Sequence, residues 1–118
     1  MPMVVAPEFL AARPELDRSK KYVLLIISGP EAGKVLNIEK TLVTIGRSGC
    51  DFIVDDPELS RRHAKVEVNG SSATLHDLGS TNGTFVDEER ITTRPLDNRG
   101  KFRVGSHEIA FVVTDRDE

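Results

Sequence analysis

The chain has 118 residues, a net charge of −3 and a single cysteine, with 38% hydrophobic and 30% charged residues. This length suits one domain whose core needs no disulfide, and the acidic balance excludes nucleic-acid binding through a broad basic surface. Cys50 alone can form neither an internal disulfide nor a zinc site, and no apolar run reaches the roughly 18 residues of a membrane span. We therefore expect a cytoplasmic protein with no metal, no cofactor, no nucleic-acid partner and no membrane insertion.

The N-terminal segment differs from the rest of the chain in composition. It carries three prolines and no sustained periodicity, and it lacks the basic start and long apolar run of a signal peptide. We expect residues 1–20 to be a flexible tail. Residues 21–114 are expected to form the folded domain, and residues 115–118 a C-terminal tail or the start of a linker.

Short strands separated by turn residues are expected to make up most of the domain. Tyr22–Ser28 is apolar at both odd and even positions, which predicts a strand buried on both faces, and Gly29-Pro30 ends it. Further short runs follow at Lys34–Ile38, Leu42–Gly46, Phe52–Val54, Ala64–Asn69, Ala73–Leu78, Thr84–Val86, Phe102–Gly105 and Glu108–Val113. Turn signals about every 8–12 residues, without a helical period after residue 20, predict a β-sandwich or barrel.

One of these runs shows the alternation typical of a strand with a single buried face. Val66 and Val68 are expected to face the core, while Lys65 and Glu67 face solvent. Asn69-Gly70 then predicts a hairpin turn, because both residues tolerate a positive φ.

Three turns hold more polar residues than a plain turn requires: Gly46-Arg47-Ser48, Ser60-Arg61-Arg62-His63 and Gly79-Ser80-Thr81-Asn82-Gly83-Thr84. A phosphate dianion needs several donors that converge from different loops. Arg47 offers a forked guanidinium that can bond two phosphate oxygens at once, Ser60 offers a short hydroxyl donor, and Arg61 adds a second positive charge. These residue types predict a site for a phosphate group.

In chain order, Gly46-Arg47, Ser60–His63 and Leu78–Val86 (LGSTNGTFV) resemble the motifs of the forkhead-associated (FHA) domain family, and their spacings agree as well. The resemblance covers roughly Tyr22 to Val113. It implies an all-β fold, a two-sheet sandwich of about eleven mostly antiparallel strands with the ligand loops at one end. It also implies recognition of phosphothreonine in an extended peptide.

By this resemblance the chain is expected to be a phosphothreonine-dependent interaction module in Ser/Thr kinase signalling, and not an enzyme. Its partners would be a phosphothreonine-containing protein or peptide and a Ser/Thr kinase of the same pathway. The chain is short for a complete signalling protein, so we expect it to be the regulatory N-terminal part of a larger one.

Each site residue has an expected role. We expect phosphate binding by Arg47, Ser60, Arg61 and Thr81. Asn82 suits the peptide backbone, because its amide both donates and accepts a hydrogen bond. Structural support is expected from Gly46, His63 and Gly83, the histidine's role being implied by the resemblance. The loops with Glu58 and Glu88 are expected to form an acidic region that disfavours Asp or Glu at the third residue after the phosphothreonine.

Two departures from the family pattern affect turns outside the phosphate site. Asp87-Glu88 stands where many members have Asn-Gly, and Gly100-Lys101 replaces the usual Gly-Asp. The conformation of these two turns, and any ligand selectivity that depends on them, cannot be carried over from the family.

Other functions fit the sequence less well. Ser60, His63 and Asp77 could form a catalytic triad, but no G-x-S-x-G elbow or α/β pattern accompanies them. The segment Gly29–Lys34 is one residue short of a P-loop and lacks the following Ser or Thr, so it predicts a hairpin turn. The remaining alternative is a β-sandwich that makes phosphorylation-independent protein contacts.

Overall fold

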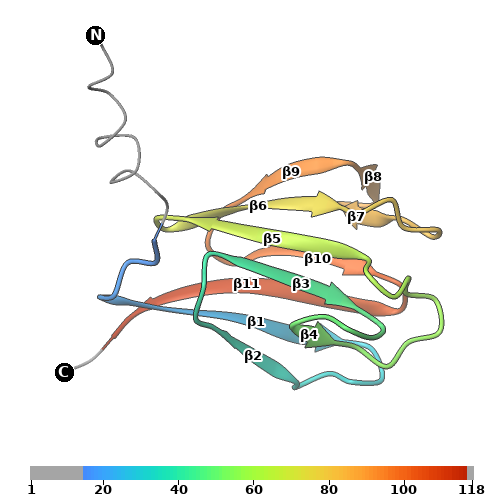
Figure 1. Cartoon of the computed structure of the whole chain (residues 1–118), viewed down its shortest axis with the longest axis horizontal. Coiled ribbons are helices and arrows are strands. Elements are labelled where there is room, and N and C mark those ends of the chain that lie inside the picture. The colour runs from blue at the N-terminus through green and yellow to red at the C-terminus, as the bar shows by residue number, and fades with distance from the viewer. Residues whose placement is uncertain (1–14, 117–118) are drawn as a thin grey trace, which may run out of the picture.

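The computed structural model describes residues 15–116, which form eleven β-strands and no helix (Figure 1). The first six strands are β1 (Lys20–Ser28), β2 (Val35–Ile38), β3 (Leu42–Gly46), β4 (Phe52–Ile53), β5 (Ala64–Asn69) and β6 (Ser72–Asp77). The other five are β7 (Thr84–Val86), β8 (Glu89–Ile91), β9 (Thr93–Leu96), β10 (Gly100–Val104) and β11 (His107–Asp115). Consequently, no helix within the described part of the chain could span a membrane.

The strands form two sheets. The six-stranded sheet has the order β2-β1-β11-β10-β7-β8, and the five-stranded sheet has the order β4-β3-β5-β6-β9. The strand pairs are antiparallel except β3 with β4, which is parallel. The expected fold, a two-sheet sandwich of about eleven mostly antiparallel strands, is confirmed.

The core lies between the sheets and is filled by alternate side chains of the strands. Phe52, Phe102 and Phe111 are among its largest fully buried members. In β5, Val66 and Val68 are buried and Glu67 is exposed, as the alternation predicted.

The prediction that β1 is buried on both faces is wrong. Its buried residues are Tyr22, Leu24 and Ile26, whereas Val23 and Leu25 are half-buried and Ile27 is 38% exposed. In a two-layer sandwich, each sheet has one face toward the core and one toward solvent. Apolar residues on the outer face of β1 therefore gave a false signal of double burial.

Strands β8 and β9 were not expected from the sequence. They are three and four residues long and lie at the edges of the two sheets. Strand β9 contains Pro95, which an edge strand tolerates because one side of its backbone needs no partner. Short polar strands of this kind lack the apolar pattern on which the prediction rested.

The ordered domain extends further than the expected bounds of 21 and 114. Strand β1 begins at Lys20, Leu16 packs against the core, and the Asp17 N–H donates to the Tyr22 hydroxyl at 3.2 Å. At the other end, the Arg116 N–H donates to the Ser19 carbonyl at 2.9 Å. The expectation of a flexible tail otherwise concerns residues 1–14, which lie outside the described residues, as do residues 117–118.

Both expected hairpins are present. Gly29–Lys34 joins the antiparallel strands β1 and β2, which confirms a turn in place of a P-loop. In the β5–β6 hairpin, Asn69 pairs with Ser72, so the two turn residues are Gly70 and Ser71 and not Asn69-Gly70. Gly70 has the positive φ (66°) that such a turn needs.

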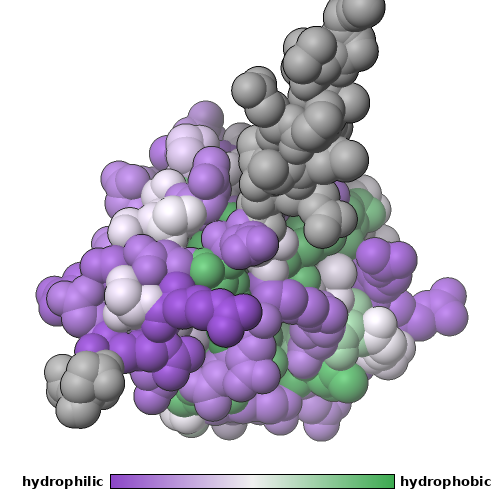
Figure 2. Space-filling model, turned by 60° about the vertical axis from the view of Figure 1, so that its left-hand side comes forward, coloured by the Kyte–Doolittle hydropathy of each residue, from purple (hydrophilic) through white to green (hydrophobic). Residues whose placement is uncertain are grey.

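The three polar turns meet at one end of the sandwich, on the right in Figure 1. They are the β3–β4, β4–β5 and β6–β7 connections. Figure 2 looks toward the other end, where mainly hydrophilic side chains cover the surface and apolar surface shows between them. The sheet scaffold thus gathers the sequence motifs at a single end.

Candidate phosphopeptide-binding site

An open hollow of ≈ 440 Å³ lies between the three polar turns. It is lined by Arg47, Pro57, Glu58, Leu59, Ser60, Arg61, Thr81 and Asn82. All the side chains that the sequence assigned to a phosphate or a peptide backbone therefore line one surface, although they come from three separate connections.

The Arg47 side chain is held by the neighbouring loop. Its Nε donates to the Leu59 carbonyl at 3.0 Å, and its backbone N–H donates to the Ser60 carbonyl at 3.1 Å. Within residues 15–116, the two terminal guanidinium nitrogens have no such acceptor. The guanidinium is thus oriented by one nitrogen and can present the other two to an anion.

Gly46 lets the β3–β4 and β4–β5 connections approach each other. A Cβ atom at this position would lie 2.0 Å from the Arg61 carbonyl oxygen and 2.8 Å from the Cys50 Sγ. Any side chain here would force the two loops apart and separate Arg47 from Arg61. Close approach, and not an unusual φ, is therefore the reason for glycine.

Ser60 connects the second and third loops. Its Oγ accepts a hydrogen bond from the Thr81 N–H at 3.1 Å, and its own N–H donates to the His63 Nδ1 at 3.1 Å. Because the Oγ acts as an acceptor toward Thr81, its proton is available to an anion in the hollow.

His63 is fully buried beneath these loops. Its Nδ1 accepts the Ser60 N–H, so the proton sits on Nε2, which donates to the Gly83 carbonyl at 2.8 Å. The ring binds no hydroxyl of Ser60, and the Asp77 carboxylate bonds to Gly79, Ser80 and Thr84 instead. This arrangement is a structural tie between loops and not a catalytic triad.

The base of the β6–β7 loop is organised by Asp77. Its Oδ2 accepts the Gly79 and Ser80 N–H groups at 2.9 and 3.0 Å, and its Oδ1 accepts the Ser80 and Thr84 hydroxyls at 2.5 and 2.7 Å. Burial by itself raises the pKa of Asp77, but these hydrogen bonds outweigh it and hold the pKa below its usual value. The start of the β6–β7 loop is therefore held by an ionised carboxylate, each of whose two oxygens accepts two hydrogen bonds.

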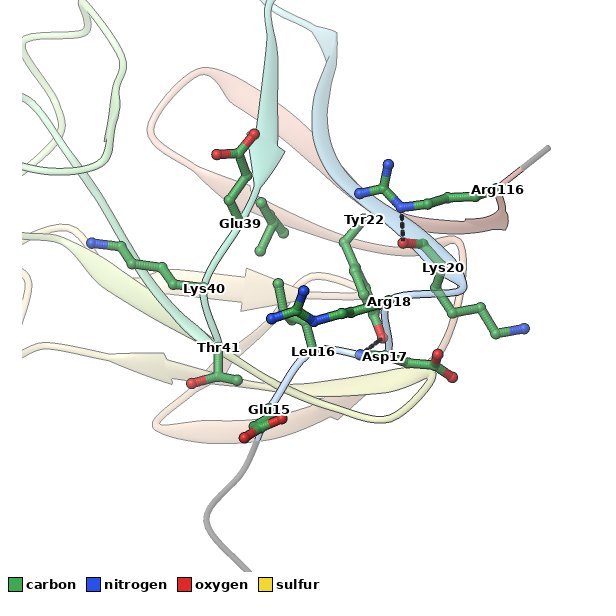
Figure 3. A pocket seen from close by; sticks show the side chains of 11 residues that line it. Glu15, Leu16, Asp17, Arg18, Lys20, Tyr22, Glu39, Lys40, Thr41 and Arg116 are labelled. Carbon is green, nitrogen blue, oxygen red and sulfur yellow. Dashed lines mark hydrogen bonds between the residues drawn. The ribbon is translucent and has the colours of Figure 1, made fainter. Parts of the chain in front are cut away.

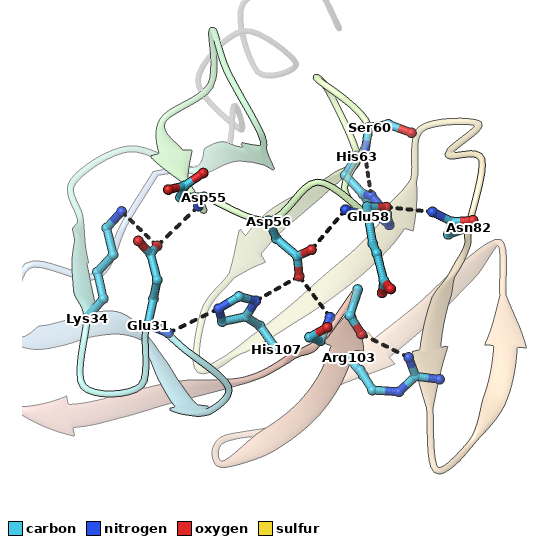
Figure 4. Close-up of polar contacts among 12 residues, drawn as sticks. Glu31, Lys34, Asp55, Asp56, Glu58, Ser60, His63, Asn82, Arg103 and His107 are labelled. Atoms are coloured by element: carbon cyan, nitrogen blue, oxygen red, sulfur yellow. Dashed lines mark hydrogen bonds and ion pairs between the residues drawn. The ribbon is translucent and has the colours of Figure 1, made fainter.

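Asn82 reaches across the hollow at the loop tip. Its Nδ2 donates to the Glu58 carbonyl at 2.8 Å (Figure 4), while Gly83 beside it has a φ of +95°. The left-handed region favours glycine, so this position turns the chain after Asn82.

Asp56 and His107 form a buried polar pair beneath the β4–β5 loop (Figure 4), which was not predicted from the sequence. Asp56 accepts hydrogen bonds from the Ser106 N–H at 2.8 Å, the His107 Nδ1 at 2.9 Å and the Glu58 N–H at 2.9 Å. The His107 Nε2 accepts the Glu31 N–H at 3.1 Å. The pair thus anchors the β4–β5 loop to β11 and to the β1–β2 turn, and the available signal was an Asp two residues before Glu58, as in an Asx turn.

The two expected specificity residues lie apart. Glu58 lines the hollow, and Figure 4 shows its side chain running away from the Ser60 hydroxyl. Glu88 lies instead in a separate hollow together with Asp87, Lys101 and Arg103. Glu58 and Glu88 therefore line different hollows and do not form one acidic region.

A larger hollow, ≈ 730 Å³, lies at the opposite end of the sandwich (Figure 3). Arg18, Lys20, Lys40 and Arg116 line it together with Glu15, Asp17 and Glu39, so groups of both charges are present. Because neither sign of charge predominates in its lining, this hollow does not favour an anion or a cation. Among residues 15–116, no group of three or more His, Cys, Asp or Glu side chains could hold a metal ion.

The fold is a two-sheet β-sandwich with a cluster of polar loops at one end. The FHA domain model matches residues 43–105, more than half of the chain, and the chain belongs to the FHA domain family. Members of this family serve as protein-interaction modules.

Among curated proteins, the chain is similar to the glycogen accumulation regulator GarA of Mycolicibacterium smegmatis, with 30% identity over 96 residues. This match covers 80% of the chain but only 61% of GarA.

Two solved structures show the same likeness. One comes from a structural and functional analysis of phosphothreonine-dependent FHA domain interactions; it is 30% identical with a TM-score of 0.70 and covers 78% of this chain and 95% of that chain. The other is the yeast Dun1 FHA domain in complex with a doubly phosphorylated peptide derived from Rad53; it is 25% identical with a TM-score of 0.68 and covers 85% and 79%.

Proposed function

We propose that this domain binds phosphothreonine-containing peptides in the hollow between the three polar loops and so recruits a protein that a Ser/Thr kinase has phosphorylated. The observation that carries the proposal is the convergence of Arg47, Ser60 and Arg61, from two connections, on one open surface beside Asn82. The phosphothreonine-dependent interactions of the related structures support it.

The chemistry of each side chain suggests which part of the phosphopeptide it would bind. The terminal nitrogens of Arg47, the hydroxyl of Ser60 and the charge of Arg61 would hold the phosphate, with Thr81 at its edge. Charged hydrogen bonds of this kind contribute about 1.5–3 kcal/mol each. Asn82 would exchange its bond to the Glu58 carbonyl for bonds to the backbone of the peptide, because its amide can both donate and accept.

The domain is proposed to act by binding alone, without catalysis, in the cytoplasm. Support comes from the His63 ring, whose two nitrogens bond to the Ser60 N–H and the Gly83 carbonyl, so it is not available as a base for the Ser60 hydroxyl. An active-serine probe should accordingly fail to label Ser60.

Calorimetry with matched peptides tests the proposal. A suitable phosphothreonine peptide should bind at micromolar strength, about −7 to −9 kcal/mol, and its unphosphorylated form should not. Arg47→Ala should weaken binding at least about tenfold, since it removes a forked, charged donor. Arg18→Ala, which removes an equal charge at the opposite end of the sandwich, is the control. Equal binding of both peptides would indicate phosphorylation-independent contacts instead.

The proposed role of Asn82 can be separated from that of the phosphate donors. Asn82→Ala should reduce peptide affinity yet leave the binding of inorganic phosphate nearly unchanged, because the amide faces the peptide backbone. Asn37→Ala, on an exposed position of β2, is the matched control. Equal losses for the peptide and for inorganic phosphate would assign Asn82 to the phosphate.

A further inference from the structure

Arg90 of β8 lies against the β6–β7 loop. Its Nη2 is 3.3 Å from the Ser80 carbonyl oxygen and 3.5 Å from the Thr81 carbonyl oxygen. Gly83 makes this approach feasible, because a Cβ atom there would lie 2.7 Å from the Arg90 Nε. A single guanidinium nitrogen therefore contacts two consecutive peptide units of the loop.

These contacts determine which way the loop amides face. The described chain has no cis peptide bond, and in a trans peptide the carbonyl and the following N–H point in opposite directions. With the carbonyls of Ser80 and Thr81 toward Arg90, the N–H groups of Thr81 and Asn82 face the other way. The Thr81 N–H indeed reaches the Ser60 Oγ, which lines the hollow, at 3.1 Å.

Two other contacts at the Thr81–Asn82 tip involve groups that a ligand would use, whereas His63 and Ser80 bond to Gly83, just after the tip. The Asn82 Nδ2 bonds to the Glu58 carbonyl, and the Thr81 N–H bonds to the Ser60 hydroxyl. A peptide that engages Asn82 and a phosphate that engages Ser60 would compete with these bonds. Asp77, in turn, holds the base of the loop through Gly79, Ser80 and Thr84 and does not reach its tip.

We propose that Arg90 is a positioning residue for phosphopeptide recognition: it holds the Thr81–Asn82 tip in its binding geometry before the ligand arrives and while the ligand is bound. This inference rests on the proposed phosphopeptide function. A loop that is already ordered loses less conformational entropy on binding, so the gain appears as affinity. Arg90 approaches the carbonyl side of the loop, so its contacts need not be given up.

The test compares Arg90→Met, which keeps the apolar stem, and Arg90→Lys, which keeps the charge, with wild type in phosphothreonine-peptide calorimetry. Both variants should weaken binding about three- to tenfold, the effect of about one hydrogen bond, because a point-like ammonium does not reproduce the planar guanidinium. The loss of affinity should persist when the salt concentration is raised from about 0.05 to 0.5 M, a change that screens long-range charge attraction. Arg94→Met on β9, whose Arg94 side chain pairs with Glu89, is the matched control.

A second measurement needs no ligand. In the free protein, amide hydrogen exchange at Thr81 and Asn82 should be faster in both Arg90 variants and unchanged in Arg94→Met. Should Arg90→Met fail to fold, Arg90→Lys and this measurement carry the test.

Two outcomes would overturn the proposal. One is equal peptide affinity and equal exchange in Arg90→Met and Arg94→Met. The other is full affinity in Arg90→Lys with a loss in Arg90→Met that vanishes at high salt, since Arg90 would then act only as a charge. Failure of the phosphate site itself is recognised separately, by an unchanged affinity in Arg47→Ala.

Discussion

His63 Nε2 donates a hydrogen bond of 2.8 Å to the Gly83 carbonyl and so ties the β4–β5 loop to the β6–β7 loop from inside the domain. The ring has no exposed surface. His63→Ala should therefore lower the free energy of unfolding by about 2–4 kcal/mol, because it leaves a cavity and two unpaired backbone groups. Denaturant titration measures this loss, with the partly exposed His76→Ala as control. An unchanged stability together with lost peptide binding would instead make His63 a direct ligand.

Asp56 makes the domain sensitive to acid. Burial raises its pKa, but its bonds to Ser106, Glu58 and His107 outweigh this and hold the pKa below its ordinary 3.8. A carboxyl with a lowered folded-state pKa stabilises the fold above its unfolded pKa, and this contribution is lost as the pH falls through the folded value. Asp56→Asn should thus cost about 1–3 kcal/mol at pH 7.

Urea titrations of wild type and Asp56→Asn at several pH values test this dependence. The difference in unfolding free energy between the two proteins should be constant near neutrality and should shrink below about pH 3.8. Asp55→Asn, at the exposed neighbouring position, is the control. A difference that is the same at pH 7 and pH 3 would show that the charge of Asp56 contributes nothing.

The β7–β8 turn is strained by its residue types. Asp87 and Glu88 have φ values of 52° and 66°, a pattern that favours Asn-Gly. Replacing the pair by Asn-Gly should raise the stability by about 0.5–1 kcal/mol, because glycine takes a positive φ without strain. Thermal unfolding measures the gain, and peptide affinity should not change because this turn lies outside the proposed site. A lower melting temperature would contradict the conformational argument.

Glu58 is the remaining candidate for acidic discrimination, since Glu88 lies elsewhere. Peptides with Asp or Glu at the third residue after the phosphothreonine should bind more weakly than those with apolar or basic residues. The effect should be modest, about 0.2–1 kcal/mol, because Glu58 is exposed. Glu58→Lys should relax or reverse it, and high salt should reduce it. A peptide series varied only at this position, measured at two salt concentrations, would contradict the idea if Asp were preferred.

The chain's own residue order was sufficient for an all-β fold and for a set of candidate site residues that the structure brings together around one hollow. Alternating apolar positions and regularly spaced turn residues are local signals, and a β-sandwich or barrel follows from them. The resemblance of the three turn motifs to the FHA family then indicated the two-sheet sandwich. Arg47, Ser60 and Asn82 could be proposed from the sequence because three short motifs, each weak by itself, occur in order and with the spacing of the FHA family.

Only the tertiary structure decided which face of β1 is covered, since both of its faces are apolar in sequence and only the packing of the second sheet distinguishes them. The same holds for Asp56 and His107, which lie 51 positions apart and form one buried pair, and for Arg90, whose role depends on where β8 places it beside the β6–β7 loop. Hydrogen bonds between such distant residues leave no periodic trace in the chain, because they exist only once strands from different parts of the sequence have come together.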